Sequence, residues 1–166
     1  AYPCEQNVQV TSELVHVVFP LEIDDDGWPP VGSERMWATT LGNDAYRIEN
    51  APFFVPHISE GDVVKAFAPG DDEWPVYVET IEWSGNCTIR VIPRQDGPLQ
   101  GDRASTLATF VTLGATGEGA GIYPIVAITV TPDLDLSAIK ALLQAGEADG
   151  RWYFEESCIG DRWANT

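Results

Sequence analysis

The stretch from Arg47 to Pro93 constrains the fold more than any other part of this chain. Short runs rich in β-branched and aromatic residues alternate there with turns that are marked by glycine and proline, as in an antiparallel meander. Gly61 lies in a tight turn before a predicted strand at 63–68, and further strands are predicted at 76–81 and 88–92. About five or six strands of this length predict a small antiparallel β-barrel or a strongly bent sheet.

Runs that precede this stretch add strands to the same sheet. Residues 15–23 are apolar and β-rich, and Pro20 indicates an edge or a bend, because proline cannot donate a ladder hydrogen bond. Strands predicted at 34–40 and 45–49 flank the sequence Gly42-Asn43-Asp44, which is typical of a hairpin turn.

The second half of the chain combines helices with strands. The predicted elements, in order, are a strand at 88–92, a helix at 102–113, a strand at 122–131, a helix at 136–145 and a strand at 152–158. Asp102 and Asp135 occupy the N-cap positions of the two helices, where an aspartate accepts hydrogen bonds from the first free N–H groups. Glycines at 114–121 predict a loop after the first helix. The order βαβαβ predicts a layer of ferredoxin-like character.

The predicted fold class is therefore α+β, a small antiparallel β-barrel or bent sheet followed by the βαβαβ layer. A chain of 166 residues is of the size of one compact domain. The predicted organisation is a flexible lead-in at 1–13, a β-rich half at 14–93, an α/β half at 94–160 packed on it as one compact unit, and a tail at 161–166.

Charge is the extreme property of the composition. Nine lysines and arginines stand against 26 aspartates and glutamates, which gives a formal net charge of −17. Such a surface repels phosphate backbones and anionic lipids, so we expect no nucleic-acid or membrane partner. It favours association with a basic protein, a basic peptide or a cationic small molecule. The longest apolar run, 122–130, reaches only about half of a membrane span.

The three cysteines, Cys4, Cys87 and Cys158, match neither a disulfide framework nor a zinc site. An odd number at irregular spacing favours reduced thiols and a cytoplasmic location. The glycines at 114–121 match no phosphate-binding motif and follow a helix where such a loop would precede one. We therefore expect no metal and no cofactor.

Several short motifs together resemble a known family. Their order is Trp37, then Asn50–Phe54, Ile58–Val64, Ser84–Val91, Leu113-Gly114 with Glu118, and Trp152–Glu156. In this order the chain resembles the bacterial domain family DUF4265 over about residues 15–157. The family pattern around Asn86 is Ser-Gly-His-Ser-Thr-x-Arg, so the resemblance implies that a histidine suited to proton transfer is replaced by Asn86 here.

Four residues are candidates for catalysis. His57 precedes Glu60 and Asp62 in a turn, and a histidine beside carboxylates suits general acid–base chemistry. The alternative is a surface histidine bonded to the backbone. Cys87 lies three residues before Arg90, and a nearby cation can lower a thiol pKa enough to make it a nucleophile. The alternative is a buried thiol that packs as a small hydrophobe.

The candidates for binding include the scarce cations. Arg90 alternates with Ile89 and Val91 in its strand, so its guanidinium is predicted to point into a partly enclosed space and to need a carboxylate partner. Glu118 is the first expected partner and Glu82 the second. Such a pair is either structural or a clamp for a ligand carboxylate. The remaining candidates are Asn86, Arg47, Trp83 and Phe54.

Two functions follow from these features. We expect an acidic cytoplasmic binding or inhibitory module that recognises a basic protein, a peptide or a small molecule without turnover. The alternative is a small tailoring enzyme of bacterial secondary metabolism, with acid–base chemistry in a pocket lined by tryptophan and phenylalanine. An enzyme would bring the polar candidates together in one deep pocket. A binding module would show a broad acidic or aromatic surface instead.

Overall fold

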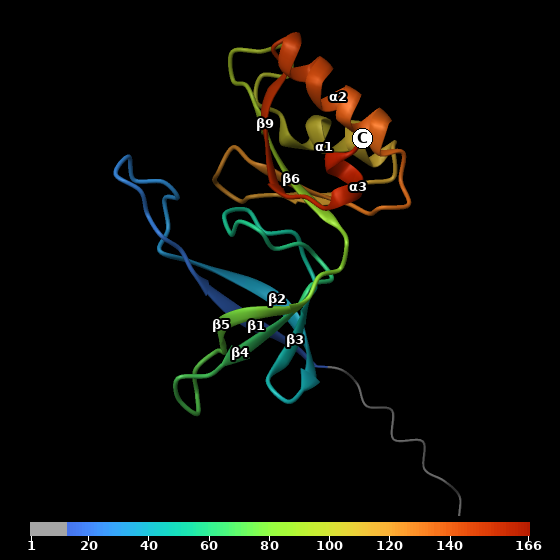
Figure 1. Ribbon diagram of the computed structural model, residues 1–166. Coiled ribbons are helices and arrows are strands. Elements are labelled where there is room, and N and C mark those ends of the chain that lie inside the picture. The colour runs from blue at the N-terminus through green and yellow to red at the C-terminus, as the bar shows by residue number, and fades with distance from the viewer. Residues whose placement is uncertain (1–12) are drawn as a thin grey trace, which may run out of the picture.

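The computed structural model of the protein describes residues 13–166, so residues 1–12 of the expected lead-in lie outside the described part. A bent sheet comes first in the chain, and a second sheet covered by helices follows (Figure 1). The strands and helices, in order, are β1 (Leu14–Pro20), β2 (Ser33–Gly42), β3 (Ala45–Ile48), β4 (Val63–Phe67), β5 (Val76–Glu82), β6 (Cys87–Pro93), α1 (Arg103–Val111), β7 (Thr116–Gly119), β8 (Val126–Val130), α2 (Leu136–Ala148), β9 (Trp152–Cys158) and α3 (Asp161–Ala164).

Strands β1 to β5 form one sheet in sequence order, with antiparallel neighbours. The sheet bends until β5 reaches β1, where Val18 pairs with Val76 in the parallel sense. The Val18 N–H also donates to the Pro75 carbonyl at 2.9 Å. The bent antiparallel sheet is confirmed, and it closes on itself through this one residue pair.

The hairpin that joins β2 to β3 has the predicted turn. Asn43 and Asp44 have φ values of 54° and 60°, a left-handed conformation that asparagine and aspartate tolerate better than most residues. Inward-pointing side chains of this sheet, with two from the segment between β3 and β4, form its apolar core: Val17, Phe19, Met36, Ala38, Ile48, Val55, Ile58, Val64 and Ala66.

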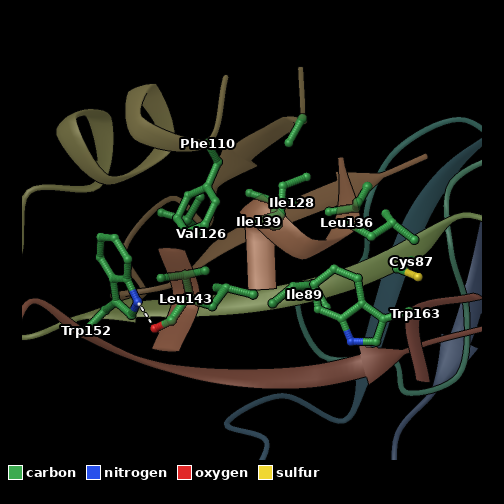
Figure 2. Packing of buried hydrophobic residues seen from close by; sticks show 13 residues of the cluster. Cys87, Ile89, Phe110, Val126, Ile128, Leu136, Ile139, Leu143, Trp152 and Trp163 are labelled. Carbon is green, nitrogen blue, oxygen red and sulfur yellow. Dashed lines mark hydrogen bonds between the residues drawn. The ribbon is translucent and has the colours of Figure 1, made fainter. Parts of the chain in front are cut away.

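The second sheet has the strand order β7-β8-β6-β9, and all its neighbours are antiparallel. Ile89 of β6 belongs to the same apolar core as Phe110 of α1 and Ile139 of α2, so both helices cover one face of the sheet (Figure 2). Thr88 and Arg90 alternate with the core residues of β6. They therefore point to the opposite face, where the segment 51–62 lies.

Strand β7 corrects the expectation of a loop at 114–121. Glycine is uncommon in strands, which is why this segment was not predicted to pair. The structure requires glycine at position 117, because a Cβ there would lie 2.3 Å from the Ala127 carbonyl oxygen of β8. The close approach of the two backbones thus explains a strand that is rich in glycine.

Both predicted N-caps are confirmed. The Asp102 carboxylate accepts from the Ser105 N–H at 3.1 Å, and the Asp135 carboxylate accepts from the Ala138 N–H at 3.0 Å. Near its end, α2 carries Gly146 because the indole of Trp152 leaves no space for a side chain. A Cβ at Gly146 would lie 2.1 Å from that ring.

The segment expected to form a tail contains α3, whose Trp163 is completely buried against the helical core. Lys140 of α2 donates to the Trp163 carbonyl at 2.9 Å and helps to hold this turn. Within residues 13–166, none of the helices has the length and the apolar character that crossing a bilayer would need.

Candidate functional site

The two sheets meet through a set of buried polar contacts around the segment 51–62, which we call the polar seam. Prolines keep residues 53–55 out of a ladder, so their backbone groups need other partners. The Glu34 carboxylate accepts from the N–H groups of Phe53, Phe54 and Val55 at 2.7, 2.9 and 3.0 Å. Arg90 donates to the carbonyls of the first two at 2.8 and 3.2 Å. One carboxylate and one guanidinium therefore hold the same tripeptide.

Arg90 is buried as predicted, with 6% of its surface exposed, but its partners differ from those expected. Glu118 and Glu82 do not pair with it. Its nearest carboxylate is Glu155 on the neighbouring strand, 3.3 Å from Nε, and this Nε–H makes no aligned hydrogen bond with any described residue. Burial lowers the pKa of Arg90, and the charges of Glu155 and Glu34 oppose that effect. Its other donor bond goes to the Ser157 hydroxyl at 2.9 Å.

Asp62, a predicted catalytic residue, belongs to the same seam. It is 1% exposed, and its carboxylate accepts from the Ser59 N–H at 2.9 Å and the Ser84 N–H at 2.8 Å. The Ser59 hydroxyl bonds the Thr88 hydroxyl at 2.8 Å. Asn86 donates to the Glu60 carbonyl at 2.7 Å. These contacts give Asp62 and Asn86 a structural task, the joining of the 59–62 turn to β6.

His57 lies apart from the two carboxylates that follow it in sequence. It is exposed, and its backbone N–H donates to the Ser157 carbonyl at 3.0 Å. With Trp83, Glu156 and Cys158 it lines a cavity of about 430 Å³. The structure thus favours the alternative reading of His57, a surface histidine that is bonded to the backbone.

Phe54 lines a further cavity of about 530 Å³ together with Arg90 and Trp28. The Phe54 ring makes edge contacts with Trp28 and Tyr123 at centroid distances of 5.6 and 5.3 Å. The cavity is mostly apolar, and the guanidinium in its wall already donates to the backbone of the polar seam.

Cys87 borders an apolar cavity of about 260 Å³ near Leu136 and Trp163. Burial raises the pKa of its thiol, the charge of Glu156 adds to the rise, and a backbone contact with Gly160 partly offsets it. Burial also raises the pKa of the second described cysteine, Cys158. Both are free thiols, and they remain protonated near neutral pH. Cys87 is therefore poorly suited to nucleophilic chemistry, while Cys4 lies outside the described residues.

We expect Cys87 and Cys158 to resist alkylation by iodoacetamide at pH 8 in the folded protein, because only a thiolate that is accessible reacts. Mass spectrometry of the labelled peptides, with urea-unfolded protein as the control, measures this. Since the folded pKa lies above the unfolded one, stability should fall as the pH rises above the ordinary thiol pKa of about 8.5. Rapid labelling of Cys87 without unfolding would contradict the expectation.

A cavity with three carboxylates lies between the two halves of the chain. Glu49 and Glu60 come from the first half and Glu118 from β7, and together they line a space of about 230 Å³ with Asn50 and with backbone of β7. We call this the acidic pocket. Within the described residues, no three acidic, cysteine or histidine side chains are placed to hold a metal ion.

Each carboxylate of the acidic pocket has one oxygen engaged. Glu49 Oε1 accepts from Thr39 and Arg47, both at 2.8 Å. Glu60 Oε2 accepts from Thr129 at 2.9 Å, and Glu118 Oε1 from Asn50 at 3.2 Å. The second oxygen of each accepts no hydrogen bond from residues 13–166, so all three can accept from a bound donor.

Most of the chain matches a known family. Residues 34–154 match the family described as Domain of unknown function (DUF4265). The chain belongs to this family. No curated protein matches it. A solved structure described as "Novel crystal structure of a hypothetical protein from Neisseria gonorrhoeae" is similar in fold, with 19% identity and a TM-score of 0.67 over 90% of this chain and 96% of that one.

The DUF4265 match contains both parts of the site. Glu34 is the first matched residue, Asp62 and Arg90 of the polar seam lie inside the match, and all three carboxylates of the acidic pocket fall within its bounds. Two partners of Arg90, Glu155 and Ser157, follow just after the match ends. The match begins after β1 and ends before α3. The motifs around Asp62 and Asn86 that carried the resemblance are those that join the two sheets.

Sequence reasoning missed Glu34 and Glu49. Glu49 follows Arg47 by two residues, and alternation along the strand predicted at 45–49 places both side chains on one face, so this pair could have been found. Glu34 lies 19 residues before Phe53, and no local pattern connects a carboxylate to amides at that separation.

Proposed function

We propose that the protein is an acidic binding or inhibitory module that recognises a basic protein, peptide or small molecule through the acidic pocket. The observation that carries this proposal is the convergence of Glu49, Glu60 and Glu118 on one cavity, each with an oxygen to spare. A guanidinium or ammonium group supplies the several donors that such a cavity can accept. The net charge of −17 adds long-range attraction for a cationic partner.

The enzyme alternative has less support. It needs His57, Glu60 and Arg90 around one bound molecule, and these three residues line different cavities. Asp62 has both carboxylate oxygens engaged by backbone N–H groups. The general acid–base groups named for that chemistry are thus spread over the molecule, whereas a reaction requires them to be held together.

Two finer features belong to the same proposal. We infer a ferredoxin-like layer for the second sheet, supported by its strand order β7-β8-β6-β9 and by the two helices on one face. We infer a cytoplasmic location, supported by the free thiols of Cys87 and Cys158.

Isothermal titration with a tetra-arginine peptide at low salt tests the proposal. We expect binding that weakens about tenfold in the double variant Glu60→Gln/Glu118→Gln, because hydrogen bonds between charged groups are lost. The control is Asp25→Asn/Glu147→Gln, which removes the same number of charges at exposed positions away from the pocket.

An equal loss of affinity in both double variants would show that overall charge alone attracts the peptide, and would contradict binding in the acidic pocket. Absence of binding by the wild-type protein would overturn the proposal altogether. Thermal melts of each variant establish that the substitutions leave the fold intact.

A further inference from the structure

An aromatic strip crosses the outer face of the bent sheet. His16 of β1 lies opposite Trp37 of β2, and their rings are 3.9 Å apart between centroids. Trp74, just before β5, makes an edge contact with the other side of His16 at 5.1 Å. The three rings thus run side by side across neighbouring strands, and we call Trp37, His16 and Trp74 the aromatic strip.

The strip faces away from the core. Val17 and Met36, the sequence neighbours of His16 and Trp37, are completely buried inside the sheet, so alternation directs the rings outward. Trp37 is 47% exposed and Trp74 is 45% exposed. Two further apolar side chains are exposed on these strands, Leu14 on β1 and Val78 on β5. Large exposed apolar surfaces of this kind mark interaction sites.

The strip continues directly into the acidic pocket. The Glu49 N–H donates to the Trp37 carbonyl at 2.9 Å, and the Trp37 N–H donates to the Asn50 side-chain oxygen at 3.0 Å. Thr39, two residues from Trp37 and on the same face, donates to Glu49 Oε1. Glu49 therefore belongs both to the outer face and to the wall of the pocket.

The opposite end of the strip is acidic as well. Asp71, Asp72 and Glu73 are exposed and immediately precede Trp74. From Glu49 to Trp74 the surface crosses three strand spacings, roughly 14 Å at about 4.8 Å each. An apolar centre with carboxylates at both ends is complementary to a segment with apolar residues between two basic ones.

We propose that the aromatic strip and the acidic pocket form one docking surface for an extended basic segment of a partner protein. The proposal rests on the function proposed above and names the partner. A basic side chain enters the acidic pocket, apolar side chains lie on Trp37 and Trp74, and a second basic side chain meets Asp71 to Glu73. Tryptophan at the centre of such a surface carries much of the binding free energy.

The test uses a peptide of defined sequence, Arg-Ser-Leu-Ser-Leu-Ser-Arg, blocked at both ends. In an extended conformation its four larger side chains share one face and its arginines lie about 20 Å apart, enough to reach both acidic ends. A second peptide replaces both leucines with serine and keeps the charge. Titrations compare the wild-type protein with Trp37→Ser, Trp74→Ser and Trp37→Phe. The matched control is Trp83→Ser, an exposed tryptophan off the strip.

We expect the leucine peptide to bind at least about tenfold more tightly than the serine peptide. Trp37→Ser and Trp74→Ser should remove this difference, Trp37→Phe should restore most of it, and Trp83→Ser should leave it unchanged. If the two peptides bind equally well and their binding depends on Glu60 and Glu118, the role of the aromatic strip is contradicted and the function proposed for the acidic pocket is kept. Failure of both peptides to bind overturns both. If sedimentation shows that the wild-type protein is a dimer and that Trp37→Ser is not, the strip binds a second copy of this chain. That result would contradict the proposed basic partner.

Discussion

Replacing Arg90 with methionine is expected to lower the free energy of unfolding by about 3 kcal/mol. Methionine fills much of the same volume, so the cost comes mainly from lost hydrogen bonds. The carbonyls of Phe53 and Phe54 and the hydroxyl of Ser157 lose a charged donor in a buried setting. Glu34 also loses the positive charge on the other side of the tripeptide that both residues hold.

Urea unfolding followed by tryptophan fluorescence measures this effect. Arg47→Met is the matched control, because its side chain is 47% exposed and pairs only with Glu49 at the surface, so a change below about 1 kcal/mol is expected. The double variant Arg90→Met/Glu34→Gln should cost less than the two single variants added together, since both act on one segment. Unchanged stability of Arg90→Met would mean that the guanidinium is held for a ligand.

Asp62→Ala is expected to destabilise the protein by a similar amount, about 3 kcal/mol. Two backbone N–H groups, that of the buried Ser59 and that of the half-buried Ser84, lose their acceptor. Asp62→Asn should cost less, because the amide keeps one acceptor oxygen. The control Asp96→Ala removes a carboxylate that is 71% exposed and pairs with Arg94, and should change stability little.

The same urea transitions measure these variants. A catalytic Asp62 would behave differently, because removing a general base lowers a rate and usually leaves the fold intact. A stable Asp62→Ala protein would therefore contradict the structural task that the polar seam gives to this residue.

Local patterns predicted much of the fold because the interactions behind them are local. The turn at Asn43-Asp44 and the caps at Asp102 and Asp135 each depend on neighbours within about four residues. Alternation in β6 correctly placed Arg90 and Ile89 on opposite faces of the sheet. Strand β7 was missed because close packing against Ala127, which no local pattern reveals, compensates for the low strand preference of Gly117.

The partners across the sheets could not be predicted in the same way. Glu118 was the expected partner of Arg90 because it lies in the glycine-rich run 117–119, yet β8 lies between their strands. Glu155 is the residue directly opposite Arg90, and that depends on the register of β9. The acidic pocket likewise combines segments that are about 60 residues apart in sequence, as Glu60 and Glu118 are. Such convergence follows from topology.

The acidic pocket draws its walls from both halves of the chain, while the two large apolar cores remain separate. A cation bound there would bridge Glu60 and Glu118, and so would act as a clasp between the halves. Occupancy and the rigidity of their junction would then be thermodynamically linked. A substitution that loosens the junction would weaken binding of the ligand even if it lies outside the pocket. By reciprocity, the ligand would restrain the movement of one half against the other.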